Sequence, residues 1–128
     1  MRLAISSLAI LLLATSCAPA APAGPPGPVP ELAGRIPGPP EHCVTMDPNA
    51  SLHIVDQRRM IYTTGGTVWL NNLASECFGN AANDILVTYP SQSQYCRGDI
   101  VRTMDRYSHI PGGSCVLGDF TPFRRPPR

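Results

Sequence analysis

Residues 51–73 read SLHIVDQRRMIYTTGGTVWLNNL, and this stretch decides the fold class. Leu52 and Ile54 alternate with polar residues, which is the two-residue period of a half-buried strand. A second apolar run, MIY, follows a polar break, and a third run, TVWL, follows Gly65-Gly66. Paired glycines suit a hairpin turn because they adopt positive φ without steric cost. The stretch therefore predicts three short antiparallel strands joined as a meander.

The rest of the chain adds short strands of the same kind. Residues 85–89 are rich in β-branched and aromatic types, and residues 94–96 are expected to return as the second arm of a hairpin. Residues 100–104 and 114–120 predict two more strands, the last of which ends at Pro122. Residues 73–84 predict no more than one turn of helix followed by a loop. We therefore predict an all-β domain, a small disulfide-stapled β-barrel or sandwich of roughly six to seven short strands, with at most one short helix.

The cysteine count indicates two disulfides. The five cysteines are Cys17, Cys43, Cys77, Cys96 and Cys115. An odd thiol in an exported chain needs an explanation, and a modification of Cys17 would leave four. Four cysteines in an oxidising compartment indicate two disulfides, for which three pairings are open. Our hypothesis pairs Cys43 with Cys115, joining the opening and closing strands, and Cys77 with Cys96, pinning a loop to the nearby hairpin.

The N-terminal segment has the pattern of an export signal. Arg2 precedes an apolar run at residues 3–14, which is too short to span a bilayer, since that takes about 20 apolar residues. The sequence ATSC at residues 14–17 resembles the lipobox of bacterial lipoproteins, although alanine stands at 14 where leucine is usual. We expect residues 1–16 to be a signal peptide and Cys17 to be lipidated. The alternative is cleavage after Ala20 or a nearby alanine, which would release a soluble periplasmic or secreted protein.

Residues 17–40 are expected to combine the lipidated cysteine with a proline-rich linker. Proline makes up nine of the positions in 18–40, and it stiffens a chain toward an extended shape. The predicted linker would hold a small β-domain, residues 41–123, away from the membrane. Residues 124–128 read RRPPR and form a basic tail. Ala18 after the cysteine is compatible with sorting to an outer membrane.

Charge and motifs argue against several functions. The chain has ten arginines, no lysine and nine acidic residues. Residues 41–123 are net acidic, which argues against nucleic-acid binding. No Cys-x-x-Cys or short His pair is present, so we expect no metal and no cofactor. No Gly-x-Ser-x-Gly or phosphate-binding glycine loop is present, so no catalytic residue is assigned. The carboxylates that a small hydrolase would draw on are Asp56, Asp84, Asp99, Asp105 and Asp119.

Arg97-Gly98-Asp99 matches a tripeptide known as a cell-adhesion signal. It lies between a cysteine-bearing strand and the apolar run IVRTM. Gly and Asp are favoured in tight turns for backbone reasons, and matches of three residues are common by chance. We therefore predict that the tripeptide is a structural turn.

Two stretches carry a family resemblance: CFGNAANDILVTYPSQSQYCRGDIV at 77–101 and GGSCVLGDFTPF at 112–123. Together with residues 54–57 and 69–73, they resemble a family of short exported bacterial proteins known only as a domain of unknown function, numbered 6491. The departures from its pattern are Gln57, where a second Asp is usual, and Tyr95, where leucine is usual. The resemblance implies export and a small β-domain, and it implies no activity.

Three function classes remain open from the sequence. The first is a non-catalytic envelope lipoprotein that is bound to a membrane by its lipid anchor and binds an unknown envelope protein or glycan. Its expected binding surface is Trp69, Asn71 and Asn72, because exposed aromatic and amide side chains are typical of such surfaces. The second class is a small secreted hydrolase or inhibitor, and the third is a metal or redox module. The absence of catalytic signatures favours the first class.

Overall fold

The structure, a computed structural model, describes residues 26–77, 83–90 and 92–128. These residues form one short 3-10 helix, η1 (Pro30–Leu32), and antiparallel strands. The strands are β1 (Ile36–Pro37), β2 (Cys43–Thr45), β3 (Ser51–Asp56), β4 (Arg59–Thr64), β5 (Thr67–Asn72), β6 (Asp84–Thr88), β7 (Gln94–Cys96), β8 (Ile100–Asp105), β9 (Pro111–Val116) and β10 (Phe120–Arg124). The predicted all-β, sandwich-like class is confirmed, with more short strands than the sequence indicated.

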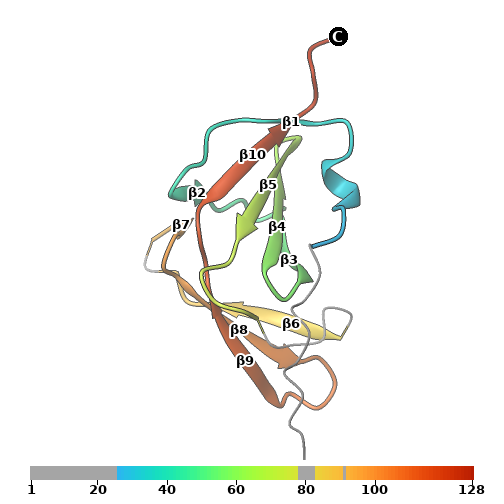
Figure 1. Cartoon of the computed structure of the whole chain (residues 1–128). Coiled ribbons are helices and arrows are strands. Elements are labelled where there is room, and N and C mark those ends of the chain that lie inside the picture. Colours follow the sequence, from blue (N-terminus) through green and yellow to red (C-terminus); the bar gives the residue numbers. More distant parts are fainter. Residues whose placement is uncertain (1–25, 78–82, 91) are drawn as a thin grey trace, which may run out of the picture.

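The strands form three sheets. Sheet A has the order β1-β10-β5-β4-β3, sheet B pairs β2 with β7, and sheet C has the order β6-β8-β9. Sheet A forms the upper part of the molecule in Figure 1 and sheet C the lower part. The predicted meander is confirmed as β3-β4-β5, and its second turn uses Gly65 and Gly66 at φ of 55° and 79°.

Sheet A buries side chains on both faces. On one face, Met60 and Tyr62 of β4 join the main core between the sheets. Ile61, between them in sequence, points to the opposite face and is fully buried against Val68 and Val29. The other buried members of the main core are Val44, Cys77, Val101, Cys115, Leu117 and Phe120.

The second face of sheet A is covered by residues 26–35, which we call the strap. Arg59 Nη2 donates to the Gly27 carbonyl at 2.8 Å, and Arg35 Nη1 donates to the Gly66 carbonyl at 2.8 Å. Immediately after the strap, β1 pairs with β10. The sequence assigned residues 17–40 to a linker, but their described part packs on the sheet because Val29 and Leu32 supply apolar contacts between the prolines. The packed domain thus begins before residue 41 and extends to Arg124.

Replacing Val29 by serine is expected to lower the free energy of unfolding by about 1–2 kcal/mol, because it removes most of a buried valine from its contacts. Val29 is 7% exposed and packs against Ile61 and Val68. Urea denaturation followed by circular dichroism measures the change. Ile36, 57% exposed on β1, gives the matched control, and Ile36→Ser should change stability by less than about 0.5 kcal/mol. Equal effects of the two substitutions would contradict a contribution of the strap to the stability of the fold.

The predicted hairpin between residues 85–89 and 94–96 is wrong. β6 pairs with β8, and β7 pairs with β2 instead. The β6–β8 register runs over five residue pairs and sends Leu86 and Val101 inward together, whereas β7 is too short to cover β6. β6 therefore pairs with β8, which forms more residue pairs and buries more apolar surface than the nearer strand β7 would.

Pro122 does not end the last strand, as the sequence predicted. The chain leaves sheet C after β9, crosses through residues 117–119 and enters sheet A as β10, which contains Pro122. The Pro122 carbonyl accepts from the Gly38 amide at 2.7 Å, so its backbone faces away from β5. The missing N–H therefore costs no ladder bond to β5.

The predicted disulfide pairing is wrong, although all four domain cysteines are bonded. Cys43 pairs with Cys96, and Cys77 pairs with Cys115, with Cα–Cα distances of 4.0 and 4.7 Å. Cys43 and Cys96 are direct register partners of β2 and β7. Cys115 lies on the inner face of sheet C and contacts Cys77 in the segment that follows β5. The predicted hairpin would have placed β7, and with it Cys96, beside β6 and away from Cys43. Two disulfides indicate an oxidising, exported environment.

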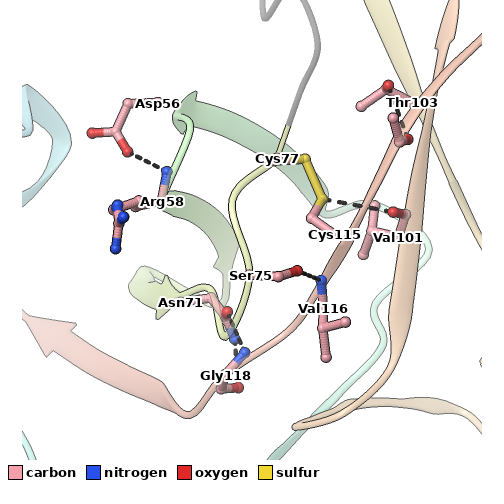
Figure 2. The surroundings of a disulfide bond; sticks show 11 residues. Asp56, Arg58, Asn71, Ser75, Cys77, Val101, Thr103, Cys115, Val116 and Gly118 are labelled. Carbon is pink, nitrogen blue, oxygen red and sulfur yellow. Dashed lines mark hydrogen bonds between the residues drawn. A yellow bond between two sulfur atoms is a disulfide. The ribbon is translucent and has the colours of Figure 1, made fainter. Parts of the chain in front are cut away.

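Figure 2 shows the second disulfide and the hydrogen bonds near it. Asn71 Nδ2 donates to the Gly118 carbonyl at 2.8 Å, and Asn71 Oδ1 accepts from the Gly118 amide at 2.9 Å. Ser75 Oγ accepts from the Val116 amide at 3.0 Å. The end of β5 is thus fixed to the crossing segment, residues 117–119, by Asn71, and the segment after β5 is fixed to β9 by Ser75 and the disulfide.

Candidate binding cleft

The structure separates the three residues of the predicted binding surface. Asn71 is fully buried, and both polar ends of its side chain are used by Gly118, so its assignment to a surface is wrong. It points inward because it follows Trp69 by two residues on the same face of β5. Asn72 is exposed at the end of β5, beside the crossing segment. Trp69 is half-buried and lies in a different hollow.

Trp69 lines a cavity of about 610 Å³, which we call the Trp69 cleft. Its size falls within the roughly 300–1,000 Å³ of small-ligand sites. The cleft lies between the edge of sheet B and the end of β4. Its lining residues are Glu41, Cys43, Val44, Thr45, Met46, Asp47, Pro48, Thr64, Trp69 and Gln94. They include two carboxylates and no basic side chain.

One wall of the cleft is fixed by a hydrogen-bond network around Asp47. Its carboxylate accepts from the Asn49 amide at 2.9 Å and from Thr64 Oγ1 at 2.8 Å, and its own amide donates to Tyr62 Oη at 2.7 Å. The Asn49 amide and then the Thr64 hydroxyl lower the pKa of Asp47, so the group is a carboxylate at neutral pH. Burial raises the pKa of Tyr62, which stays a neutral phenol. The wall is therefore rigid and negatively charged.

The indole of Trp69 forms the aromatic part of the cleft. Its Nε1 is buried and has no hydrogen-bond partner among the described residues. Arg124 of β10 places its guanidinium carbon 6.0 Å from the ring centroid, the distance at which a cation is still attracted by an aromatic face. The ring thus already has a cation near its face.

Sequence reasoning predicted Trp69 but missed Glu41, Asp47 and Gln94. These residues come from segments more than 20 positions away from Trp69 in sequence, and the pairing of β2 with β7 brings them together. The only local signal was Asp47-Pro48-Asn49, which is typical of a turn in which the aspartate binds a following amide.

Two of the aspartates considered for hydrolysis, Asp56 and Asp105, accept hydrogen bonds from nearby backbone amides. Asp105 Oδ1 accepts from the amides of Tyr107 and Ser108 at 3.0 and 2.7 Å. Asp56 Oδ1 accepts from the Arg58 amide at 2.9 Å, and its other oxygen accepts from Arg59. Asp84 faces Asp105 in the β6–β8 register, but the Asp105 carboxylate is turned into its own loop. Within residues 26–77, 83–90 and 92–128, no group of three His, Cys, Asp or Glu could hold a metal ion.

The Arg97-Gly98-Asp99 tripeptide forms a turn, as predicted. Gly98 has φ of 93°, and Asp99 Oδ2 accepts from the Cys96 amide at 2.8 Å. Arg97 Nη1 instead lies 3.4 Å from Asp119 Oδ2, and His42 Nδ1 lies 2.7 Å from Asp119 Oδ1. The hydrogen bond from His42 and the charge of Arg97 lower the pKa of Asp119.

Stability is expected to fall as pH drops below about 4, with little change between about pH 5 and 7. Asp47, Asp105 and Asp119 have lowered pKa values in the folded state, mainly through hydrogen bonds. Burial raises the pKa of Asp56, but its bonds to Arg59 and Arg58 outweigh this and lower it overall. Below the unfolded pKa of about 3.9, the unfolded chain binds protons first, so their stabilisation is lost as pH falls through the folded values.

Urea denaturation at a series of pH values checks this dependence. Asp105→Asn keeps an oxygen acceptor for the turn but cannot titrate, so its stability should fall less steeply below about pH 4 than that of the natural chain. A steeper or unchanged pH dependence in this variant would contradict a stabilising role for the Asp105 carboxylate.

No family model, curated protein or solved structure matches the chain. The resemblance to domain of unknown function 6491 stays a prediction. The part of the chain that the structure describes contains no helix with the length and apolar character needed to cross a bilayer.

Proposed function

We propose that the protein is an exported envelope protein, anchored to a membrane by lipidated Cys17, that binds a basic segment of another envelope protein without catalysing a reaction. The Trp69 cleft is its binding site. The observation that carries this proposal is the combination of one aromatic wall and one carboxylate wall around a concave space. Such a site suits an arginine or lysine side chain, which an aromatic face and a carboxylate both attract.

The charge distribution supports a basic ligand over a neutral one. Glu41 and Asp47 line the cleft, and the guanidinium near Trp69 belongs to Arg124, outside the lining residues. An incoming basic side chain would meet two carboxylates and could replace Arg124 over the ring. A neutral glycan would stack on Trp69 but would leave both carboxylates without a cationic partner.

Fluorescence titration tests the proposal, because Trp69 is the only tryptophan and reports the cleft directly. We expect a short arginine-containing peptide to change its emission in a saturable manner and a neutral cell-wall glycan fragment to leave it unchanged. Glu41→Gln should weaken peptide binding about fivefold or more, since it removes an exposed charge without a packing contact. Glu31→Gln, an exposed acid on the strap, is the matched control and should bind normally.

Trp69→Phe separates the ring from the rest of the site. Binding of a labelled peptide, followed by its own anisotropy, should weaken about threefold or more, because phenylalanine is a poorer partner for a cation than tryptophan. Saturation by the glycan fragment with no response to the peptide would reject the basic ligand. Unchanged binding in both Glu41→Gln and Trp69→Phe would reject the cleft.

A further inference from the structure

The outer face of sheet C carries an apolar surface with no layer over it among the described residues. In the register of β6 with β8, Ile85 faces Met104 and Val87 faces Arg102, all on the outer side. The residues between them in β8, Val101 and Thr103, point inward and are 0% and 1% exposed. Among the described residues, sheet A is covered on both faces, whereas sheet C is covered on one.

Exposed side chains extend this surface at both ends of the sheet. The exposed fractions are 38% for Ile85, 75% for Tyr89, 53% for Ile100, 80% for Tyr107 and 64% for Ile110. Tyr89, Ile100 and Arg102 line one hollow of about 380 Å³. We call these residues, with Val87, Met104 and Arg102, the sheet C face.

The chemistry of the sheet C face fits the boundary between a bilayer and water. Tyrosine places its ring at the headgroup level, aliphatic side chains enter the apolar region, and arginine reaches anionic headgroups. Arg102 is exposed on this face. The nearby Asp99 and Asp105 direct their carboxylates into their own turns, so they are already bonded to backbone amides.

The entry point of the chain lies beside this sheet. Gly27 is held by Arg59, next to the β3–β4 turn. β3 and β6 line a common hollow through Ile54 and Ile85, so the start of the strap is close to the edge of sheet C. Figure 1 shows the described chain beginning beside β3, above β6 in this view. Residues 18–25 are the eight between Cys17 and Pro26, and they span at most about 30 Å when fully extended.

We propose that the sheet C face rests on an anionic membrane surface and that the lipid tether at Cys17 keeps it there. This inference rests on the proposed lipid anchor. The short tether enters on the side of sheet C, so it holds this end of the molecule near the bilayer. Thr64, which lines the Trp69 cleft, lies at the β4–β5 turn at the opposite end of sheet A from Gly27, so the cleft faces away from the membrane.

Vesicle co-sedimentation of the mature chain, residues 17–128, with Cys17→Ser isolates the surface from both the lipid and the signal peptide. Vesicles of three parts phosphatidylethanolamine to one part phosphatidylglycerol should bind this protein, and vesicles of phosphatidylcholine should bind it about fivefold less, since they carry no net negative charge. Ile100→Ser with Ile110→Ser should reduce binding about fivefold or more, because both side chains would lose apolar burial. Ile36→Ser, equally exposed on β1, is the matched control and should bind like the parent.

A local probe reports which surface makes contact. In a chain with Trp69→Phe, the Tyr107→Trp emission should shift to shorter wavelength on anionic vesicles, and the Ile36→Trp emission should not. Equal shifts at the two positions, or full binding by the double serine variant, would overturn the proposal. Sedimentation without vesicles that shows a dimer lost in the double variant would assign the face to a second copy of the chain instead. Intact-mass measurement of the natural mature protein tests acylation of Cys17 separately, so the two failures are distinguishable.

Discussion

Replacing Cys77 and Cys115 together by alanine is expected to lower the free energy of unfolding by about 4 kcal/mol. The bond closes a loop with a sequence separation of 38, and the loss follows from the greater freedom of the unfolded chain without it. Both cysteines are 1% exposed and belong to the main core, so shortening them also leaves a small void. For a domain of this size, the melting temperature should fall by roughly 15–30 °C.

Differential scanning calorimetry of the natural and double-alanine chains measures this loss. The Cys43/Cys96 double-alanine variant removes a bond with a separation of 53 and should be destabilised by a similar amount, about 4 kcal/mol. Cys17→Ser gives the control for losing a cysteine outside these two bonds and should leave the melting temperature unchanged. A domain that keeps its melting temperature after full reduction and alkylation would contradict the importance of both disulfides.

Gly118→Ala is expected to destabilise the fold by about 3 kcal/mol or more, the second large effect. A methyl group at this position would overlap the carbonyl oxygen of Asn72, which is backbone and cannot rotate away. Moving the crossing segment to make room would also break the two hydrogen bonds between Asn71 and Gly118 in a fully buried site. Each unsatisfied buried group adds roughly 1–3 kcal/mol.

Gly27→Ala is the matched control for this substitution. A methyl group at Gly27 meets nothing within 4 Å, so its stability should stay within about 0.5 kcal/mol of the natural chain. Urea denaturation of both variants gives the comparison. Equal stability of Gly118→Ala and Gly27→Ala would show that the crossing segment can move freely, against the close approach described for it.

Local sequence patterns predicted the meander, whereas pairings between strands far apart in the sequence could not be predicted from such patterns. β3, β4 and β5 follow one another with short turns, so alternation and Gly65-Gly66 were enough. Cys43 of β2 and Cys96 of β7 are 53 positions apart, and the sequence of neither three-residue strand indicates that it pairs with the other. The predicted disulfide pairing was wrong for the same reason, because Cys43 and Cys96 lie opposite each other on these two strands.

The candidate site shows the same division. Trp69 was predicted from its residue type, while Glu41 and Gln94 entered the cleft only through sheet B. The sequence could have separated Asn71 from Asn72, since neighbouring residues on a strand face opposite sides of the sheet. The strap was missed because its apolar residues, Val29 and Leu32, stand among prolines and show no strand or helix period.

The strap also determines how the protein would respond to force. A pull transmitted from Cys17 reaches the Gly27–Arg59 contact first and then Val29, so the segment would detach from sheet A one contact at a time. Extension would stop at Cys43, where the load passes through sulfur to Cys96. Release of residues 26–42 would add about 60 Å of chain. With Cys17 anchored as proposed above, the domain would follow a bound partner away from the bilayer under tension while the main core stays folded.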